Sequence, residues 1–462
     1  MNRLSLTLRL IARLALLVAI FAHTAEAAGT VEHTLSNGLR IIVKPDHRAP
    51  VVVSLLWYKV GSVDEVNGTT GVAHVLEHMM FKGTRNLGAG EFSKLIAAAG
   101  GRDNAFTSKD YTGYFQMLHK SQLGLAFKLE ADRMANLVLT PEEFAKEIRV
   151  VMEERRWRTD DRPRATLYER LMATAFLAHP YRNPIIGWMS DLQNMRPEDA
   201  HAFYEQWYAP NNAILVVVGD VAPDEVFAMA REHFGAIQPK ALPVRKPQDE
   251  PPQRGLRRLS VKASAELPYV VMAFRAPKLA DPEKDWEPYA LEMLANILDG
   301  NAASRLPHVL VRTERLANSA SASYDGVGRG PGVFYLDGVP AAGRSVAELE
   351  QALRREVRRI ADEGVAENEL RRVKAQAVAS YVYQRDSMFF QARQIGAMEI
   401  AGLPHTTLDL QLEKLKQVTP AQVQDVARRY FGDDELTVAY LDPQPLSGRR
   451  EFRPPAGLRH VE

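Results

Sequence analysis

The sequence predicts an α+β protein made of two similar domains joined by a proline-rich linker. Strand-like and helix-like runs are mixed along the chain, without the regular βαβ order of a parallel sheet. A proline, a helix-forming stretch and an apolar strand at residues 197–220 recur at residues 420–442. The two prolines are 223 positions apart (420 − 197), and a single shift of this size favours a duplicated domain of about 200 residues over a short repeat.

The first 27 residues are typical of an export signal. A basic start is followed by an uninterrupted apolar run from Leu14 to Ala22, and Ala25-Glu26-Ala27 fits the small-x-small cleavage pattern. The apolar run is shorter than the roughly 20 residues that a membrane span needs, so a retained anchor is less favoured. We therefore expect an exported chain with no membrane span after cleavage, periplasmic if the source is a Gram-negative bacterium.

The first domain, predicted at residues 28–238, begins with a β-hairpin. The runs 32–36 and 39–43 flank Asn37-Gly38, a strong signal for a type I′ turn. A strand rich in Val and Leu follows at 51–58. The remaining elements are helices around 70–82, 90–99, 121–137, 141–158 and 197–208, and strands at 111–118 and 213–218.

The linker is predicted at residues 239–256. Residues 239–254 contain five prolines and several charges but almost no large apolar side chains, a composition typical of an extended, semi-rigid segment. The second domain is expected at 257–446. Residues 447–462, rich in Arg and Pro, are expected to form a tail.

The composition excludes several kinds of chemistry. The chain contains no cysteine, which excludes disulfide scaffolds, cysteine nucleophiles, iron–sulfur clusters and thiolate zinc sites. Any bound metal must therefore be held by His, Asp or Glu. The 58 basic residues balance the 57 acidic ones, so nothing in the net charge of +1 indicates nucleic-acid binding.

Residues 69–83 predict a short helix that begins with a Thr cap and ends at a glycine. Because His74 and His78 are four positions apart, both imidazoles project from one face of this helix. This spacing lets both rings reach one zinc ion at about 2.0–2.1 Å. Glu77 shares the face and is suited to hold a water molecule and take its proton. The other histidines are expected to be ordinary surface or core residues, among them His119, His179 and His201.

A catalytic zinc site needs a third protein ligand, and residues 140–158 supply candidates. Glu147 and Glu154 are two turns apart and share one stripe of the predicted helix, whereas Glu153 points about 100° away from Glu154. One of these carboxylates is expected to bind the metal and another to orient a histidine. The spacing alone does not choose among Glu147, Glu153 and Glu154.

The His-x-x-Glu-His motif belongs to a longer pattern. GVAHVLEHMMFKGT is followed by GGRDNAFTSKDYTGYF, and then by IRVVMEE, HPYRNPIIG and YAPNNAILVVVGD. This pattern resembles the pitrilysin/insulinase family of inverted zincins, and in particular short two-domain bacterial members similar to the subunits of mitochondrial processing peptidase. The resemblance implies two homologous α/β-sandwich domains of the pitrilysin/LuxS-like metallohydrolase fold.

The resemblance also implies roles for the candidate side chains. His74, His78 and Glu154 match the ligands of one Zn²⁺ per chain. Glu77 matches the general base, and Glu147 matches the carboxylate that orients a ligand from behind. The segment GGRDNAFTSKDYTGYF is similar to the family's edge strand, which implies that Asn104, Ala105 and Phe106 bind an extended peptide by strand addition.

The second domain lacks a His-x-x-Glu-His motif, so we expect it to bind no zinc. Many relatives carry an Arg followed seven positions later by a Tyr in this half, and both residues grip the substrate. Arg312 is present here, but Asn318 stands one position before the expected Tyr. Tyr324 is a candidate substitute if its loop allows it.

The resemblance implies an exported zinc metalloendopeptidase that hydrolyses short or unfolded polypeptides. In two-subunit relatives the zinc motif and the Arg/Tyr pair lie on different chains. We therefore expect a heterodimer with a similar non-catalytic subunit, or a homodimer. The alternative function is a non-catalytic scaffold or chaperone-like subunit of a peptidase-like complex, because a fold alone does not fix function.

Overall fold

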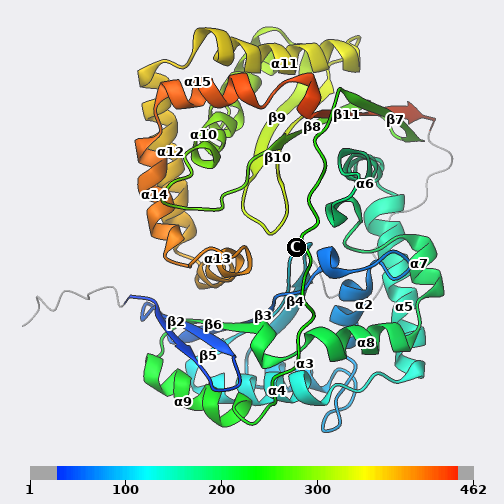
Figure 1. Cartoon of the computed structure of the whole chain (residues 1–462), viewed down its shortest axis with the longest axis vertical. Coiled ribbons are helices and arrows are strands. Elements are labelled where there is room, and N and C mark those ends of the chain that lie inside the picture. Colours follow the sequence, from blue (N-terminus) through cyan, green and yellow to red (C-terminus); the bar gives the residue numbers. More distant parts are fainter. Residues whose placement is uncertain (1–28, 446–462) are drawn as a thin grey trace, which may run out of the picture.

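The computed structural model describes residues 29–445, so the predicted export signal and the tail lie outside the described residues. The chain forms two halves, each with a sheet and covering helices, at the bottom and the top of Figure 1. We call residues 29–238 the first half and 257–445 the second half. The prediction of a two-domain α+β fold is confirmed. Between residues 29 and 445, no helix is both long and apolar enough to cross a bilayer.

The first half contains a mixed sheet of six strands within the described chain. Strand β4 (Arg102–Thr107) lies at one edge of this sheet. Strands β2 and β6 run parallel, and the other neighbours are antiparallel. In spatial order the strands are β1 (Val31–Thr34), β2 (Arg40–Pro45), β6 (Ala213–Gly219), β3 (Val51–Tyr58), β5 (Thr112–His119) and β4 (Arg102–Thr107).

The sheet of the second half repeats this order without a counterpart of β1. Its first two strands run parallel and the others are antiparallel, as in the first half. This common topology supports the duplication predicted from the recurring sequence pattern. In spatial order the strands are β7 (Arg257–Ser264), β11 (Leu436–Gln444), β8 (Tyr269–Ala276), β10 (Gly332–Pro340) and β9 (Ala317–Asp325).

Helices cover both sheets. Those of the first half are α2 (Val72–Met79), α3 (Glu91–Ala98), α4 (Leu123–Asn136), α5 (Pro141–Arg155), α6 (Pro163–Ala175), α7 (Met189–Asn194), α8 (Pro197–Trp207) and α9 (Pro223–Phe234). Those of the second half are α10 (Glu287–Asp299), α11 (Val346–Glu363), α12 (Glu367–Gln384), α13 (Met388–Ile400), α14 (Thr407–Gln417) and α15 (Pro420–Arg429). All helices and strands predicted in the first half are present, with ends shifted by a few residues.

The two halves exchange one helix each. Helix α6 of the first half packs on the second sheet, where Leu167 and Leu171 join a buried cluster with Val271 and Ala439. Helix α13 of the second half packs on the first sheet, where Ala392 and Ile395 join a cluster of strand residues. Those strand residues are Ile42, Val53, Leu55, Trp57, Ile214, Val216 and Val218. Each half therefore completes the core of the other.

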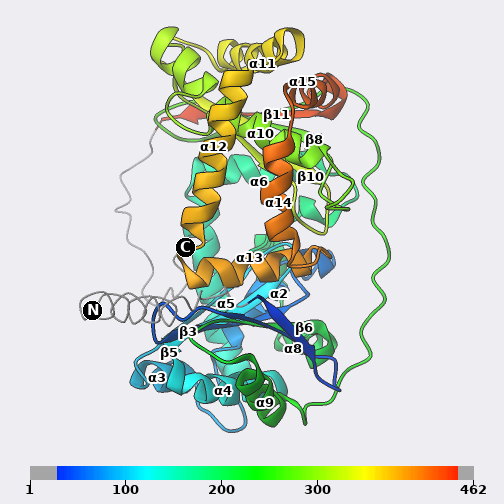
Figure 2. The same cartoon turned by 90° about the vertical axis from the view of Figure 1, so that its left-hand side faces the viewer.

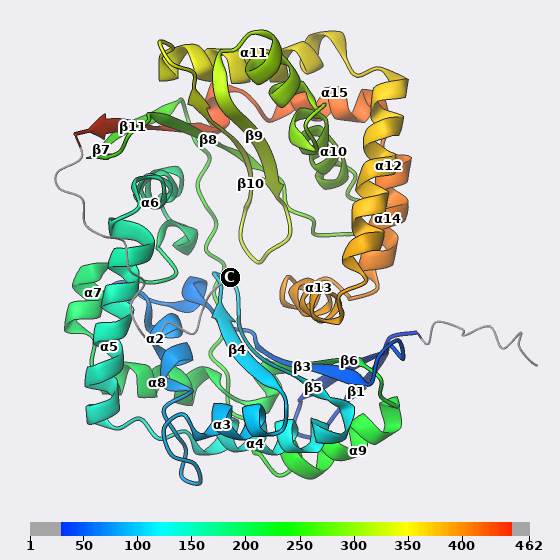
Figure 3. The same ribbon diagram turned by 180° about the vertical axis from the view of Figure 1, so that it is seen from behind.

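The tip of the β9–β10 hairpin also joins the halves, because it reaches down to the first half (Figure 3). The Arg329 guanidinium donates to both carboxylate oxygens of Asp64 (2.7 and 2.8 Å), and its amide N–H donates to Asp110 (2.9 Å). The next amide, of Gly330, donates to the Tyr181 hydroxyl at 2.9 Å. This polar contact adds to the two apolar clusters at the junction.

The segment between the halves has no helix or strand from residue 239 to 254. It runs along the molecule from α9 to β7 (Figure 2). Polar contacts hold it: Glu250 accepts the amide N–H groups of residues 177–179 at 2.7–2.9 Å, and Arg245 donates to Asp64 at 2.7 Å. These contacts fit the extended linker that the sequence predicts.

The hairpin of β1 and β2 forms as predicted, but its turn is not of type I′. A type I′ turn requires positive φ at both central residues. In the described chain Arg315 is the only non-glycine residue with positive φ, so Asn37 does not meet this requirement, although Gly38 has a φ of +88°. The buried Asn37 amide instead donates to the carbonyl oxygens of Phe234 (2.8 Å) and Ile237 (3.0 Å). Asn37 therefore ties the hairpin to the end of α9.

Candidate metal centre and cleft

Helix α2 carries the His-x-x-Glu-His motif, and all eight of its residues are buried. The prediction that a threonine caps this helix is wrong. Its N-cap is Gly71, whose φ of +89° lies in the left-handed region that favours glycine. The buried Glu65 carboxylate accepts the amide N–H groups of Gly71 (2.7 Å) and Ala73 (2.9 Å). The start of α2 is thus fixed by a side chain from a preceding turn.

Three potential metal ligands meet where α2 packs against α5. One ligand atom from each of His74, His78 and Glu154 lies within 4.8 Å of the others. The Nε2 atoms of His78 and His74 are 3.2 and 3.7 Å from Glu154 Oε2. Two imidazole nitrogens and one carboxylate oxygen are a donor set that suits zinc and leaves a coordination position open. The residues present therefore fit a zinc ion.

The structure separates the three candidate carboxylates of α5. Glu154 is fully buried and faces both histidines, whereas Glu153 lies at the surface and pairs with Arg156 at 2.8 Å. Glu147 lies behind His78, with its Oε1 2.9 Å from His78 Nδ1. Lys82 contacts the other oxygen of Glu147 at 2.5 Å. Because Glu147 engages Nδ1, it fixes the ring so that Nε2 points to the shared position of the ligands.

The charges at this position favour a cation. Burial lowers the pKa of the His78 imidazole, but the contacts with Glu147 and Glu154 outweigh burial and raise the pKa to about 9. Burial also opposes the charge of Glu154, yet the hydrogen bond from His78 and the charge of His74 lower the pKa of Glu154 to about 2. The carboxylates thus stabilise positive charge beside the histidine nitrogens.

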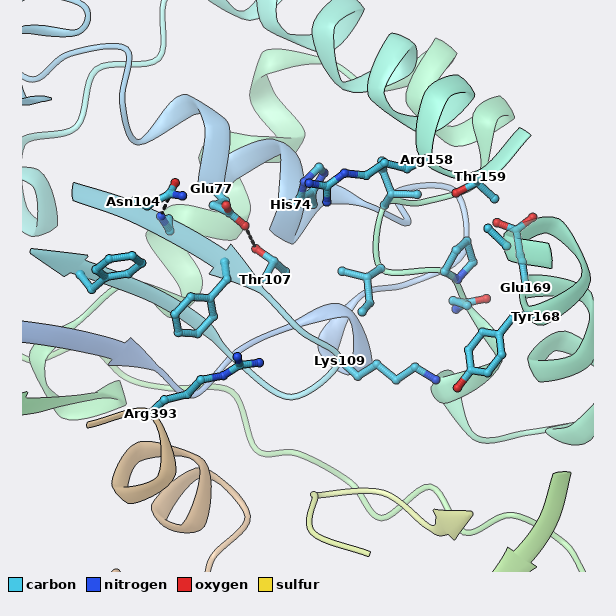
Figure 4. A pocket seen from close by; sticks show the side chains of 18 of the residues that line it. His74, Glu77, Asn104, Thr107, Lys109, Arg158, Thr159, Tyr168, Glu169 and Arg393 are labelled. Carbon is cyan, nitrogen blue, oxygen red and sulfur yellow. Dashed lines mark hydrogen bonds between the residues drawn. The ribbon is translucent and has the colours of Figure 1, made fainter. Parts of the chain in front are cut away.

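Glu77 lies next to the histidines with 1% of its surface exposed. The Thr107 hydroxyl, at the end of β4, donates to Glu77 Oε2 (Figure 4). Burial raises the pKa of Glu77 to about 7, although the charge of His78 and the hydrogen bond from Thr107 oppose the shift. A carboxylate with a pKa near 7 is suited to exchange a proton at neutral pH.

Glu77 and His74 open into a cleft of about 1040 Å³. Strand β4 lines one side of this cleft, with Asn104, Ala105 and Phe106 among the lining residues. Because β4 is the edge of its sheet, it has no strand on its outer side in the described chain. The edge strand of a sheet can accept an extended peptide as an additional strand.

The structure does not bring the second-half candidates to this cleft. Arg312 is exposed on a π-helical segment, Pro307–Thr313, and is not among the described residues that line the cleft. Asn318 is exposed on β9. The Tyr324 hydroxyl donates to the Pro277 carbonyl oxygen, and its ring packs within the second half. None of these three residues is among the described residues that line the cleft.

Several residues at the site had no specific signal in the sequence. Thr107, Lys82 and Arg158 contact Glu77, Glu147 and Glu154, respectively. Only Arg158 could have been identified from spacing, because it lies one helical turn after Glu154. Two more cleft residues, Phe389 and Arg393, come from α13 of the second half.

Comparison with known proteins agrees with this geometry. Residues 40–188 match the insulinase family (peptidase family M16), and residues 194–377 match the peptidase M16 inactive domain. The zinc protease PqqE of Helicobacter pylori is 34% identical over 427 residues, which cover 89% of this chain and 92% of that protein. An uncharacterized zinc protease of Mycobacterium leprae is 30% identical over 416 residues, which cover 88% of this chain and 90% of that protein.

Solved structures show the same architecture. The crystal structure of a protease from Helicobacter pylori matches with a TM-score of 0.85 at 32% identity, over 90% of this chain and 100% of that one. A peptidase M16 inactive domain from Pseudomonas fluorescens has a TM-score of 0.81 at 17% identity, over 91% and 100% of the two chains, and shows the fold alone. Taken with the match over nearly the whole length to the Helicobacter pylori zinc protease, these findings show that the chain belongs to the insulinase family of peptidases, M16.

Proposed function

We propose that the protein is a zinc-dependent metalloendopeptidase in which His74, His78 and Glu154 hold the ion and Glu77 is the general base. One observation carries this proposal: a donor set that fits zinc lies beside a buried carboxylate, at a cleft bordered by the edge strand β4. The names of the relatives, which are zinc proteases, support it.

The residues suggest how a peptide bond would be cleaved. Zinc held by this donor set would supply Lewis-acid polarisation of the scissile carbonyl group and lower the pKa of a water molecule. Glu77 takes a proton from the attacking water on its carboxylate and returns it to the leaving amine. Thr107 orients Glu77 through its hydrogen bond, and Glu147 orients His78. Glu77 therefore acts first as base and then as acid within one turnover.

The substrate is proposed to be a short or unfolded polypeptide. Residues 104–106 would pair with it through backbone hydrogen bonds of β4. The cleft is bounded by both halves, since β4 forms one side and α13 contributes Phe389 and Arg393. A volume of about 1040 Å³ accommodates an extended segment but excludes a folded domain. We place the mature protein outside the cytoplasm, on the basis of the export signal predicted from residues 1–27 of the sequence.

A second chain is proposed to complete the substrate site. Arg312 is exposed and is not among the described residues that line the cleft of its own chain, which favours its presentation to a substrate by another chain. A similar non-catalytic subunit or a second copy of this chain would meet this requirement. Native mass spectrometry of the purified complex tests the proposal, and a stable monomer with full peptidase activity would contradict it.

Three measurements test the peptidase itself. We expect cleavage of a quenched peptide library by the zinc-loaded protein, and loss of that cleavage with a chelator. Glu77→Gln should keep its zinc and lower kcat by about 10²–10⁴-fold, the usual contribution of a general base. His74→Ala should lose zinc in metal analysis, whereas His201→Ala, an exposed histidine of α8, should keep it. A fully zinc-loaded protein that cleaves no peptide would instead indicate a non-catalytic scaffold.

A further inference from the structure

Helix α13 brings an arginine of the second half into the cleft of the first. The Arg393 guanidinium lies 5.8 Å from the ring centroid of Phe106, which is on β4. Figure 4 shows Arg393 on the side of the cleft opposite Glu77 and Asn104. Arg393 is exposed, and among the described residues no carboxylate forms an ion pair with it. Its charge is therefore available to a molecule in the cleft.

The cleft as a whole carries more positive than negative side chains. Two charged residues of the lining are already neutralised by ion pairs. Arg158 pairs with Glu154 at 3.0 Å, and Glu169 pairs with Arg155 at 2.8 Å. Apart from His74 and Tyr168, the ionisable lining residues are five basic ones, Arg102, Lys109, Arg158, Arg182 and Arg393, and three acidic ones, Glu77, Asp103 and Glu169. The excess of positive charge favours ligands with carboxylates.

A peptide added to β4 would place alternate side chains toward Arg393. Successive residues of a strand point to opposite faces. Thr107 points to Glu77, whereas Phe106 points to the other face, where its ring contacts Trp57 and lies near Arg393. Phe106, near Arg393, and Thr107, bonded to Glu77, are neighbours only about 3.3 Å apart along β4. On a peptide paired with β4, the side chain nearest Arg393 would therefore lie within about two positions of the reacting bond.

We propose that Arg393 determines specificity by binding an acidic side chain of the peptide, within about two positions of the cleaved bond. This inference rests on the proposed peptidase function. A guanidinium matches the geometry of a carboxylate and can donate two parallel N–H···O bonds. At a partly exposed position, such a pair should favour Glu over Gln by about three- to tenfold. Lys at the same position should be disfavoured further by repulsion.

The test uses quenched peptides of one sequence, in which a single Glu, Gln or Lys is moved through the positions around the cleaved bond. Wild type is compared with Arg393→Gln and Arg393→Glu, and with Arg371→Glu as the matched control. Arg371 is an exposed arginine of α12 that is absent from the cleft's described lining. We expect the Glu preference in kcat/KM at one position, mainly through KM. Arg393→Gln should abolish it, Arg393→Glu should invert it, and Arg371→Glu should retain it.

Binding gives a readout that does not require turnover. Fluorescence anisotropy with labelled peptides and the Glu77→Gln variant should show tighter binding of the Glu peptide, and loss of this difference when Arg393→Glu is added. Equal binding of the Glu and Lys peptides, or a Glu preference that survives Arg393→Glu, would overturn the role of Arg393. Absence of hydrolysis alone would overturn the peptidase, while binding would still decide the role of Arg393.

Discussion

The contact between α13 and the first sheet leaves no room for a side chain at Gly396. A Cβ atom there would lie 2.1 Å from Cε2 and 2.2 Å from Nε1 of the Trp57 indole. Trp57 is completely buried, so its ring has no solvent space into which it could turn. Ordinary contacts of a Cβ atom begin at 3.4 Å, so Gly396→Ala requires α13 or the ring to move by more than 1 Å.

We expect Gly396→Ala to destabilise the protein by about 1–3 kcal/mol, the usual cost of overpacking a core. Without the clash, the substitution would stabilise α13 by up to about 1 kcal/mol, because alanine has the higher helix propensity. Gly124→Ala in α4 provides the matched control. The nearest atom to its Cβ would be Met229 Sδ at an ordinary 3.8 Å, so we expect no loss of stability there.

Urea unfolding followed by far-UV circular dichroism measures both variants. A double-mutant cycle with Trp57→Phe isolates the contact, because the smaller ring removes the crowded indole atoms. We expect the double variant to be more stable than the sum of the single effects by over about 1 kcal/mol. Additive effects in the cycle, or a Gly396→Ala variant as stable as Gly124→Ala, would refute the helix exchange as described.

Three further predictions concern the metal centre and the junction. Glu147→Gln should weaken zinc binding by about 10–100-fold in a chelator competition, because Glu147 orients His78; unchanged affinity would exclude this role. Tyr181→Phe should lower the free energy of unfolding by about 1–3 kcal/mol, since the buried Gly330 N–H loses its acceptor; urea titration measures the loss. Burial lowers the pKa of His179 to about 4, below its ordinary 6.5, so stability should be full above pH 6.5 and decline as the pH falls toward 4. This decline should be shallower in His179→Asn, and equal slopes would contradict the assignment.

The elements with local signals could be predicted from the sequence. The His-x-x-Glu-His spacing placed His74 and His78 on one helical face, and the family resemblance pointed to Glu154. The cap of α2 could not be predicted, because Glu65 is separated from the helix by a turn and Thr70 offered the usual cap residue. The predicted type of the turn at Asn37 was wrong for a similar reason. The carbonyl groups that accept hydrogen bonds from the Asn37 amide, at the end of α9, lie about 200 residues away in the sequence.

The exchange of α6 and α13 between the two halves also could not be predicted from the sequence pattern. An apolar stripe shows that a helix will be buried, but it does not show which sheet it will cover. The role proposed for Arg393 depends on this exchange, because α13 belongs to the half without the histidines. Sequence spacing relates residues along one helix, whereas this site combines α2, α5 and β4 with a helix more than 200 residues further along the chain.

The exchanged helices also constrain the order of folding. Trp57 lies on β3, early in the chain, yet the helix that covers it ends at residue 400. This face of the first sheet therefore stays uncovered until most of the chain has been synthesised. Such distant contacts are formed late and slowly, because a long loop must close first. Neither half can therefore cover both faces of its sheet alone. A chain cut within the linker should yield two fragments that fold only in each other's presence.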